Sequence, residues 1–398
     1  MRDRRAVSRC GVPRIGIMTH TAVLSGAELA MLRWVEHIPA DRFQPVAVVL
    51  RAGPLVDRLR SLGIETHVVP LGGVAATAER SALLSSTGLR GVLQIVVFLP
   101  RLTRALRELR LDLVQTNSLK SDLIGLVATR LAHVPLVWYV HDRISRDYLP
   151  RPVATFFRVL ARLGPRRLVV NSEATRESLR LPAFIAYPGV DPSWGNSSTV
   201  ADLAAPRHKT APPVIGLVGR ISPTKGQREF VLAAARVLDD HPDATFRIIG
   251  SAMFNEADYE TEVRGLVDEQ GLGDRVHFCG FAKDVAAAMR QLDLLVHASP
   301  VPEPFGQVIA EAMALGVPVI ATDAGGAVEV LRDGNQELGL LVPPGDSEAL
   351  AEAIARTLDD PEAARQRAAL AVPSVRSRFD VRRTAATLMS VWHDALDT

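Results

Sequence analysis

The sequence contains little cysteine, no long apolar run and no apolar segment behind its basic N-terminus. Its two cysteines, Cys10 and Cys279, are expected to be free thiols of a reducing cytoplasm, and no CxxC or His/Cys cluster predicts a zinc site. The longest mainly apolar stretch, Val92–Leu99, contains Gln94 and stops at Pro100, well short of the roughly 20 residues that cross a bilayer. These absences argue against a secreted, disulfide-linked or membrane-spanning protein, so we expect a cytoplasmic one, at most peripheral at the inner membrane face.

Charge is distributed unevenly along a chain of 398 residues, a length that suggests two domains. Residues 1–190 hold 27 Arg and Lys against 14 Asp and Glu, whereas residues 191–398 hold 19 against 30. Two solvated surfaces of unlike charge would explain this. Alternatively, the first half meets an anionic membrane, a phosphorylated acceptor or an acidic glycan, with Arg101, Arg104 and Arg107 on one predicted helix as first candidates. No nucleic-acid partner is expected.

Short runs of Val, Ile and Leu alternate with helical segments, which is the pattern of a parallel sheet covered by helices. The strands predicted in the first half are Arg14–His20, Pro45–Leu50, Thr66–Val69, Asp112–Thr116, Leu136–His141 and Arg167–Asn171. Those predicted in the second half are Val214–Gly219, Thr245–Gly250, Arg275–Cys279, Asp293–His297, Val317–Thr322 and Gly339–Val342. The clearest helices between strands are Ala27–Ile38, Leu119–Ala132 and Pro152–Leu163. Ser25 is predicted to be an N-cap, with Glu28 completing a capping box.

Turn-forming residues without periodicity separate the two halves. We therefore predict an α/β protein with a Rossmann-like domain over residues 1–190, a linker over 191–212 and a second Rossmann-like domain over 213–375. A C-terminal helix within 376–398, after a break at Pro373, is expected to cross back to the first domain.

One informative segment carries two glutamates, Glu303 and Glu311. Three prolines around the first forbid a helix, so Glu303 is expected in a rigid loop after a strand. A helix is predicted to begin near Phe305 or Gly306, and Glu311 is expected to lie off its buried stripe. That predicted stripe consists of Val308, Ile309, Ala312 and Met313. Two carboxylates at the carboxyl edge of a sheet can bind sugar and ribose hydroxyls, although two solvated surface glutamates would give the same pattern.

The other informative segment places Gly219 and Arg220 at the end of a strand and Lys225 and Gly226 at the start of the next helix. Two cations beside a helix N-terminus favour a diphosphate, because charge, N–H donors and dipole all attract an anion. Neither GxxxxGK[ST] nor GxGxxG occurs here, which argues against a P-loop and against a dinucleotide oxidoreductase. Two ordinary loop cations are the alternative.

With these segments in this order, the chain resembles the retaining nucleotide-sugar glycosyltransferases of GT-B fold, family 4 in particular. The resemblance rests on the Glu-x7-Glu pattern of Glu303 and Glu311 and on the Gly-Arg…Lys-Gly pattern around Arg220 and Lys225. Further matches are Ser25-Gly26-Ala27-Glu28, His141-Asp142, Asn171-Ser172, residues 276–281 and residues 324–326. The chain departs from the family at Ser25 and Pro304, where glycine is usual or frequent.

The resemblance implies two Rossmann-like domains facing across a cleft, the first for the acceptor and the second for a nucleoside-diphosphate sugar. It implies His141, Arg220, Lys225 and Glu303 as catalytic residues, with His141 near the anomeric centre and the two cations on the departing diphosphate. The implied donor-binding residues are Ser25, Gly26, Gly219, Arg220, Lys225, Gly280, Phe281, Glu303, Phe305, Gly306 and Glu311. No cofactor, no metal and no protein nucleophile are implied, and the acceptor is a hydroxyl of a small molecule or a growing glycan.

Two other functions stay open. A nucleotide-sugar epimerase on the same fold would need further acid and base residues, which the sequence does not identify. A non-catalytic, anion-binding surface protein would use the basic first half and leave the donor motifs without a role.

Overall fold

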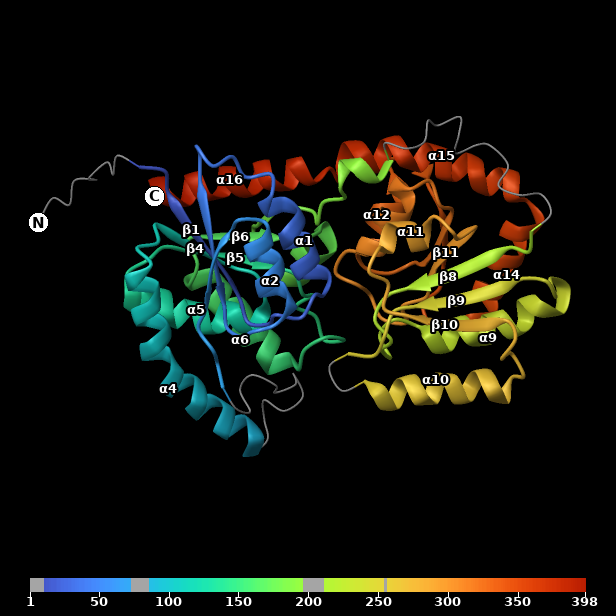
Figure 1. Ribbon diagram of the computed structural model, residues 1–398, viewed down its shortest axis with the longest axis horizontal. Helices are drawn as coiled ribbons and strands as arrows, with labels where there is room; N and C mark the ends of the chain where they lie inside the picture. Colours follow the sequence, from blue (N-terminus) through green and yellow to red (C-terminus); the bar gives the residue numbers. More distant parts are fainter. Residues whose placement is uncertain (1–10, 73–85, 196–210, 254–255) are drawn as a thin grey trace, which may run out of the picture. The chain divides into compact units, whose positions relative to one another are not determined.

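The computed structural model describes residues 11–72, 86–195, 211–253 and 256–398 (Figure 1). The chain divides into two compact units. Unit 1 comprises Met1–Asn171, Leu179–Ala186 and Arg382–Thr398, and unit 2 comprises Ser172–Ser178 and Tyr187–Val381. Cys10 and residues 196–210 of the predicted linker lie outside the described residues, while Cys279 is an exposed free thiol.

Unit 1 is built on a seven-stranded parallel sheet with strand order β3-β2-β1-β4-β5-β6-β7. The strands are β1 (Arg14–Thr19), β2 (Gln44–Val49), β3 (Glu65–Val68), β4 (Leu113–Thr116), β5 (Leu136–Val140), β6 (Arg167–Val170) and β7 (Phe184–Ile185). The helices are α1 (Gly26–Val35), α2 (Pro54–Ser61), α4 (Ser86–Glu108), α5 (Leu119–Ala132), α6 (Arg151–Leu163) and α16 (Val381–Asp397). The six predicted strands are confirmed to within one or two residues, and the short edge strand β7 is an addition.

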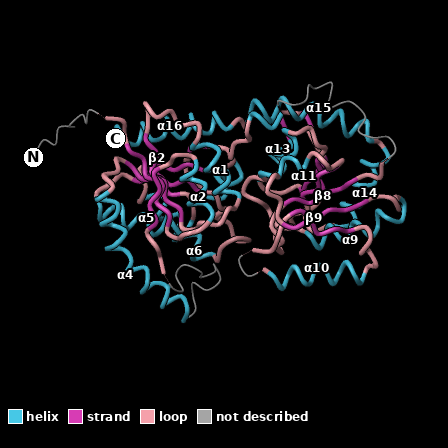
Figure 2. The backbone as a smooth tube through the Cα atoms, viewed as in Figure 1, coloured by secondary structure: helices cyan, strands magenta, loops and turns pink. Residues whose placement is uncertain are grey.

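The central strands β1, β4, β5 and β6 of unit 1 are almost entirely buried because helices cover both faces of the sheet (Figure 2). Side chains of α4, α5 and α6 share one apolar cluster with alternate residues of the strands, including Val114, Trp138 and Val170. Since both faces are covered, the strands read as continuous apolar runs rather than as alternating ones.

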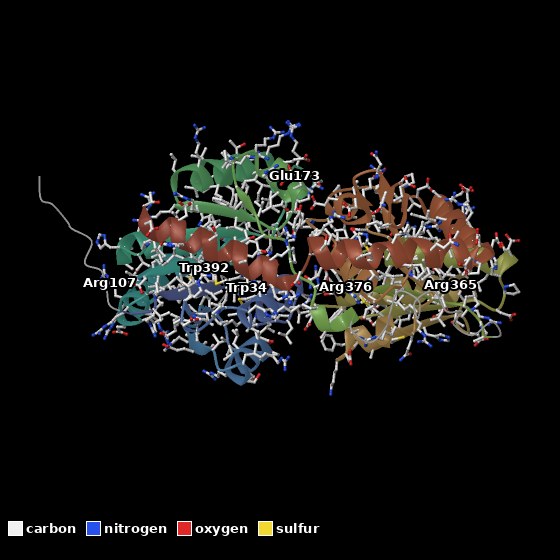
Figure 3. The ribbon with its side chains drawn as sticks, turned by 90° about the horizontal axis from the view of Figure 1, so that it is seen from above. Trp34, Arg107, Glu173, Arg365, Arg376 and Trp392 are labelled. Atoms are coloured by element: carbon white, nitrogen blue, oxygen red, sulfur yellow. The ribbon has the colours of Figure 1, made fainter. Side chains whose placement is uncertain are left out.

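Helix α16 contributes the end of the chain to unit 1. Trp392 packs edge-to-face against Trp34 of α1 and against Phe43, with ring centroids 6.1 and 5.4 Å apart (Figure 3). Its indole N–H donates to Gln115 Oε1 on β4 over 2.7 Å, in a buried position. A satisfied indole inside an aromatic contact anchors the helix firmly.

Pro373 does not break the preceding helix, as the sequence suggested it would. α15 (Pro361–Arg378) runs through Pro373 and ends before Phe379. One proline removes one helical hydrogen bond, and here the neighbouring Ala371 and Val375 are buried in the core of unit 2, which holds the chain helical. Tertiary packing outweighs the local preference.

Unit 2 repeats the architecture with a six-stranded parallel sheet of order β10-β9-β8-β11-β12-β15. The strands are β8 (Val214–Val218), β9 (Thr245–Ile249), β10 (Val276–Gly280), β11 (Leu294–His297), β12 (Val319–Thr322) and β15 (Leu340–Val342), with a separate hairpin of β13 (Arg332–Asp333) and β14 (Gln336–Glu337). The helices are α7 (Glu173–Leu179), α9 (Gln227–Asp240), α10 (Ala257–Glu269), α11 (Val285–Met289), α12 (Gln307–Ala314), α13 (Gly326–Leu331), α14 (Ser347–Asp359) and α15.

Each sheet has a point where the strand order reverses, between β1 and β4 in unit 1 and between β8 and β11 in unit 2. Open α/β sheets bind their ligands outside the carboxyl ends of the strands at such a point. In the part of the chain that the structure describes, no helix has the length and apolar character needed to span a bilayer.

Candidate functional site

The two motifs singled out in the sequence meet at the switch point of unit 2. Lys225 follows β8, Glu303 follows β11, and these two strands are neighbours in the sheet. The Lys225 Nζ atom forms an ion pair with Glu303 Oε1 across 78 residues of sequence. The pair stands where the topology places a ligand.

Glu303 is a buried carboxylate held between two nitrogen groups. Its other oxygen, Oε2, lies 3.3 Å from His297 Nε2. Burial by itself would raise the pKa of Glu303, but the charges of Lys225 and His297 outweigh it and hold that pKa below its usual range. Glu303 is therefore ionised at neutral pH and accepts hydrogen bonds rather than donating a proton. The sequence reasoning missed His297; its place at the end of a strand beside the switch point was the available signal.

The loops carrying Lys225 and Glu303 are packed backbone against backbone. Gly226 adopts φ +77°, and a Cβ there would lie 1.9 Å from the Ala298 carbonyl oxygen, so only glycine fits. The buried Ser299 hydroxyl donates to the Thr224 carbonyl over 2.6 Å. These contacts fix the ammonium and the carboxylate relative to each other.

Arg220 is the second candidate cation. Its Nη1 lies 3.1 Å from Glu256 Oε2, and its carbonyl accepts from the buried Gln227 side chain over 2.7 Å. Gly219 precedes it, and a Cβ there would lie 3.9 Å from Lys225 Cδ, so the lysine stem passes this residue. Each cation is thus held by a carboxylate, and both come from the loop after β8.

Glu311 lies on α12, but not off the buried stripe as predicted. Only 4% of Glu311 is exposed, and its Oε1 accepts from Gln307 Nε2 over 2.9 Å. The reason is that α12 packs against α13 and α15 as well as against β11 and β12, so nearly the whole helix is buried. Val308, expected in the stripe, is only half-buried. A carboxylate in such surroundings is costly unless it has polar partners.

The remaining predicted donor residues of unit 2 differ in what they offer. Gly306 is the N-cap of α12, at an N-terminus whose first N–H groups lack partners within the helix. The Phe305 ring is buried against Tyr187 and Phe379, and only 3% of the residue is exposed, so its side chain is part of the core. Gly280 ends β10, two strands from β8, and Phe281 beside it is 60% exposed.

Ser25 and Gly26 lie in unit 1, at the loop between β1 and α1. Ser25 is the N-cap by position, but the predicted capping box is wrong, because its side chain caps no backbone N–H. Instead the Ser25 hydroxyl donates to the carboxylate of Glu28, which also accepts from the Thr19 hydroxyl over 3.1 Å. Glu28 is buried, so it takes these hydroxyl partners and ties the loop to the strand end.

His141 also lies in unit 1, directly after β5. Its Nε2 lies 3.1 Å from Asn117 Oδ1, its ring packs on Tyr139, and its carbonyl accepts from Asn171 Nδ2 over 3.1 Å. Burial lowers the pKa of His141 to about 4, with the charge of Asp142 opposing the shift. The imidazole is therefore neutral at neutral pH and serves as a hydrogen-bonding group.

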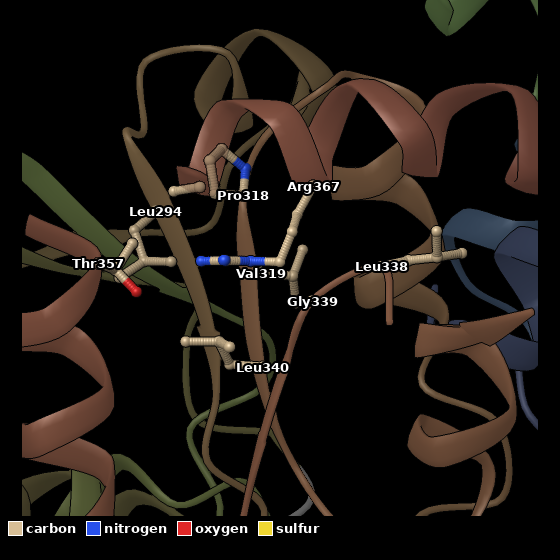
Figure 4. A pocket seen from close by; sticks show the side chains of 9 residues that line it. Leu294, Pro318, Val319, Leu338, Gly339, Leu340, Thr357 and Arg367 are labelled. Carbon is tan, nitrogen blue, oxygen red and sulfur yellow. The ribbon is translucent and has the colours of Figure 1, made fainter. Parts of the chain in front are cut away.

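A separate small pocket lies elsewhere in unit 2, and Arg367 reaches into it from α15 (Figure 4). It is lined by Leu294, Pro318, Val319, Leu338, Gly339, Leu340, Thr357, Ala364 and Arg367, and includes none of the predicted site residues. Among the described residues, no three His, Cys, Asp or Glu side chains gather as a metal site.

Two family descriptions match the chain: "Glycosyl transferases group 1" over residues 201–371 and "Glycosyltransferase Family 4" over residues 51–194. The chain is 31% identical to 2-deoxystreptamine glucosyltransferase of Streptomyces kanamyceticus, covering 69% of this chain and 76% of the relative. It is 34% identical to D-inositol 3-phosphate glycosyltransferase of Corynebacterium glutamicum, covering 72% of each. The crystal structure of Anabaena HepE in complex with UDP-glucose matches with a TM-score of 0.80 at 26% identity, covering 96% of this chain and 99% of that one.

Proposed function

Because this chain belongs to the GT-B glycosyltransferases and resembles family 4, we propose that it transfers a sugar with retention of configuration and without a metal. The observation that carries this proposal is the Lys225–Glu303 pair at the switch point of unit 2. The relative crystallised with UDP-glucose supports a UDP-sugar as the donor. The relatives named for 2-deoxystreptamine and D-inositol 3-phosphate support a small-molecule acceptor, with a growing glycan as the other candidate.

In the proposed mechanism Arg220 and Lys225 neutralise the diphosphate as it departs. Negative charge grows on that group as the glycosidic bond breaks, so preorganised cations stabilise the transition state more than the bound donor. An ammonium has three donors, so Lys225 can keep Glu303 and also reach a phosphate oxygen. The acceptor attacks from the face that the nucleotide leaves, and the donor phosphate oxygen takes its proton.

Glu303 would accept a hydrogen bond from a sugar hydroxyl, and Glu311 would accept from the ribose. Both roles need ionised carboxylates, and the low pKa of Glu303 fits the first. An epimerase would need a proton donor and a base near neutral pH, whereas Glu303 and His141 both have pKa values below that range. These protonation states favour transfer over epimerisation. A non-catalytic anion binder would have no use for the Glu303 carboxylate.

The direct test of this site is to remove the charge of Lys225. Lys225→Ala should lower kcat by about 10²–10³, the usual effect of one preorganised donor, with a smaller change in donor KM. Arg220→Lys should also be slow, because an ammonium cannot contact phosphate oxygens in the two-pronged way of a guanidinium. The matched control is Arg236→Ala, which breaks another ion pair of unit 2, with Glu348 at 3.0 Å. A kcat within about threefold of wild type for both site variants would mean that the diphosphate site is misassigned.

We also propose that unit 1 contacts an anionic membrane surface. Arg104 is largely exposed on α4, although Glu108 is its partner at 2.7 Å. The guanidinium of Arg107 (Figure 3) contacts the Leu131 carbonyl on α5, and that of Arg130 the Leu163 carbonyl on α6, so the three helices form one layer. The most exposed large apolar side chains on this layer are Leu93, Val96, Val97, Val127, Leu131, Phe156, Val159 and Leu163. Exposed apolar side chains among arginines are typical of an interfacial surface.

A further inference from the structure

Ser172, which belongs to the Asn171-Ser172 match in the sequence, has no role in the proposed chemistry but contacts the loop of Glu303. It is fully buried and stands directly before α7. Its Oγ accepts from the Thr175 N–H over 2.9 Å, which is the contact of an N-cap. Its hydroxyl proton goes to the Pro304 carbonyl. One side chain therefore joins the start of α7 to the residue after Glu303.

The same loop is held from its other side by the start of α13. Glu303 pairs with Gly325 in a β-bridge, and its carbonyl accepts from the Gly326 N–H over 2.9 Å. Gly325 adopts φ +62°, and a Cβ there would lie 2.3 Å from the Glu303 carbonyl oxygen. Only glycine permits so close an approach. The backbone of Glu303 is thus pressed against α13.

Helices α13 and α7 are in turn connected to each other. Glu329 of α13 accepts, through Oε2, the N–H of Glu173 at the first position of α7 over 3.0 Å. The contacts form a closed ring. The Glu303 loop contacts Ser172 at the start of α7, α7 contacts Glu329 of α13, and the start of α13 contacts the Glu303 loop again. Oxygen acceptors at a helix N-terminus are favoured by its free N–H groups and its dipole, so the ring is made of strong contacts.

Helix α7 is not connected directly to any strand of the unit 2 sheet. Ser172–Ser178 belong to unit 2, although β6 before them and β7 after them are strands of unit 1. The strands directly before and after α7, β6 and β7, are thus both strands of the other sheet. The contact between this segment and the loop of Glu303 therefore lies within unit 2, although the strands on either side of the segment belong to unit 1.

We propose that Ser172 and Glu329 are positioning residues for Glu303, acting through the N-terminus of α7. This inference rests on the role of Glu303 in the proposed sugar transfer. Their bonds set where the Glu303 carboxylate stands relative to Lys225. Displacing a catalytic group by about 1 Å can cost on the order of 10²-fold in rate, even when the change is made elsewhere.

The test compares variants that remove and variants that keep each bond. Ser172→Ala removes a hydroxyl that both donates and accepts, and Glu329→Ala removes the acceptor of the Glu173 N–H. Each variant should lower kcat by about 10–100-fold and change the Kd of UDP by less than about threefold. Ser172→Thr keeps a hydroxyl and Glu329→Gln keeps an acceptor oxygen, so both should stay close to wild type. An alanine variant with kcat near wild type, or a conservative variant as slow as its alanine counterpart, would overturn the proposal.

Asp346→Ala supplies the matched control. Asp346 is the N-cap of α14 and accepts from the Glu348 and Ala349 N–H groups over 3.1 and 2.9 Å, so its loss also removes a helix cap from unit 2. It should lower Tm about as much as Ser172→Ala and leave kcat unchanged. If Asp346→Ala slowed turnover as much as Ser172→Ala, the effect would be one of general stability and the proposal would fall.

Hydrogen–deuterium exchange keeps this test separate from the proposed activity. In Ser172→Ala, amides of residues 303–308 and the Gly326 amide should exchange faster than in wild type, whereas Asp346→Ala should leave them unchanged. If wild type transferred no sugar but these amides lost protection, the proposed function would fail and the positioning contact would stand. Unchanged exchange in Ser172→Ala would overturn the contact, whatever the activity.

Discussion

At the scale of single residues, Glu311 gives the sharpest binding prediction. Its carboxylate is buried beside Gln307 on α12 and is proposed to accept the ribose hydroxyls. Glu311→Ala should weaken UDP binding by about 1.5–3 kcal/mol, the scale of hydrogen bonds to a charged group. Isothermal calorimetry measures it, with Glu269→Ala on an exposed position of α10 as the control. Unchanged affinity in a variant that is still folded would remove Glu311 from the site.

Sequence reasoning found the residues whose type and spacing are themselves informative. Lys225 and Glu303 are 78 positions apart, yet they follow neighbouring strands, and parallel strands bring their carboxyl ends to one edge. His297 could not be found in this way, because a lone histidine at a strand end has no spacing to mark it. The predicted capping box of Ser25 and Glu28 failed because a buried carboxylate selects its partners by tertiary position.

At the scale of elements, the contact between α13 and α7 makes stability depend on pH. Burial raises the pKa of Glu329 to about 7. The carboxylates of Glu173 and Glu177 add to this shift, whereas the Glu173 N–H and the charge of Arg378 oppose it. Tyr187 also interacts electrostatically with Glu329. Glu329 therefore stays protonated to a higher pH in the folded protein than in the unfolded chain, where the pKa of a glutamate is near 4.5. The contribution of Glu329 to the free energy of unfolding should fall as pH rises from about 4.5 to 7 and then stay level.

Glu329→Gln tests this pH dependence, because it keeps the acceptor for the Glu173 N–H and carries no charge. It should be more stable than wild type above pH 7, by about 1–3 kcal/mol, and equal to it near pH 4.5. Urea denaturation at the two pH values measures the difference. The control is Glu362→Gln, which alters an exposed carboxylate paired with Arg365. A Glu329→Gln advantage that did not grow with pH would contradict the assignment.

Element boundaries were predictable where buried runs and turn residues agreed, as for α5, whose predicted and observed bounds coincide. They were not predictable where packing decided. Pro373 lies inside α15, and α12 is buried nearly all round because helices α11, α13 and α15 and strands β11 and β12 contact it. The pattern of one sequence indicates which residues favour a helix, but it does not show which neighbouring elements will pack against that helix.

At the scale of the whole molecule, the two Rossmann-like sheets followed from the alternation of strands and helices, and the comparisons with known structures confirm them as the GT-B fold. That α7 belongs to unit 2 could not be read from the sequence, because it stands between two strands of unit 1. The sequence predicted that the C-terminal helix returns to the first domain but not which residue holds it there; Trp392, a buried indole paired with Gln115, supplies the physical reason.

The basic, partly apolar layer of α4, α5 and α6 predicts binding of unit 1 to anionic bilayers. The protein should co-sediment with phosphatidylglycerol vesicles at low salt and stay in the supernatant at high salt, because salt screens the attraction between the arginines and the anionic headgroups. Phe156→Ser combined with Leu163→Ser should reduce binding, whereas Leu370→Ser, at an exposed apolar side chain on α15 in unit 2, should not. Absence of binding even at low salt would refute the membrane contact.

The measurement that tests the central claim most directly is product analysis of the purified chain with a panel of nucleotide-sugars in excess chelator. One donor, which we expect to be a UDP-sugar, should release free nucleoside diphosphate, and the release should be faster when an acceptor hydroxyl is supplied. Proton NMR of the product should show the transferred sugar with the donor's anomeric configuration. Turnover should be unaffected by the chelator, because Arg220 and Lys225 supply the charge that a metal would otherwise provide. Interconversion of sugars without transfer, inverted configuration, activity that returns only with Mg²⁺ or Mn²⁺, or no release from any donor would contradict it.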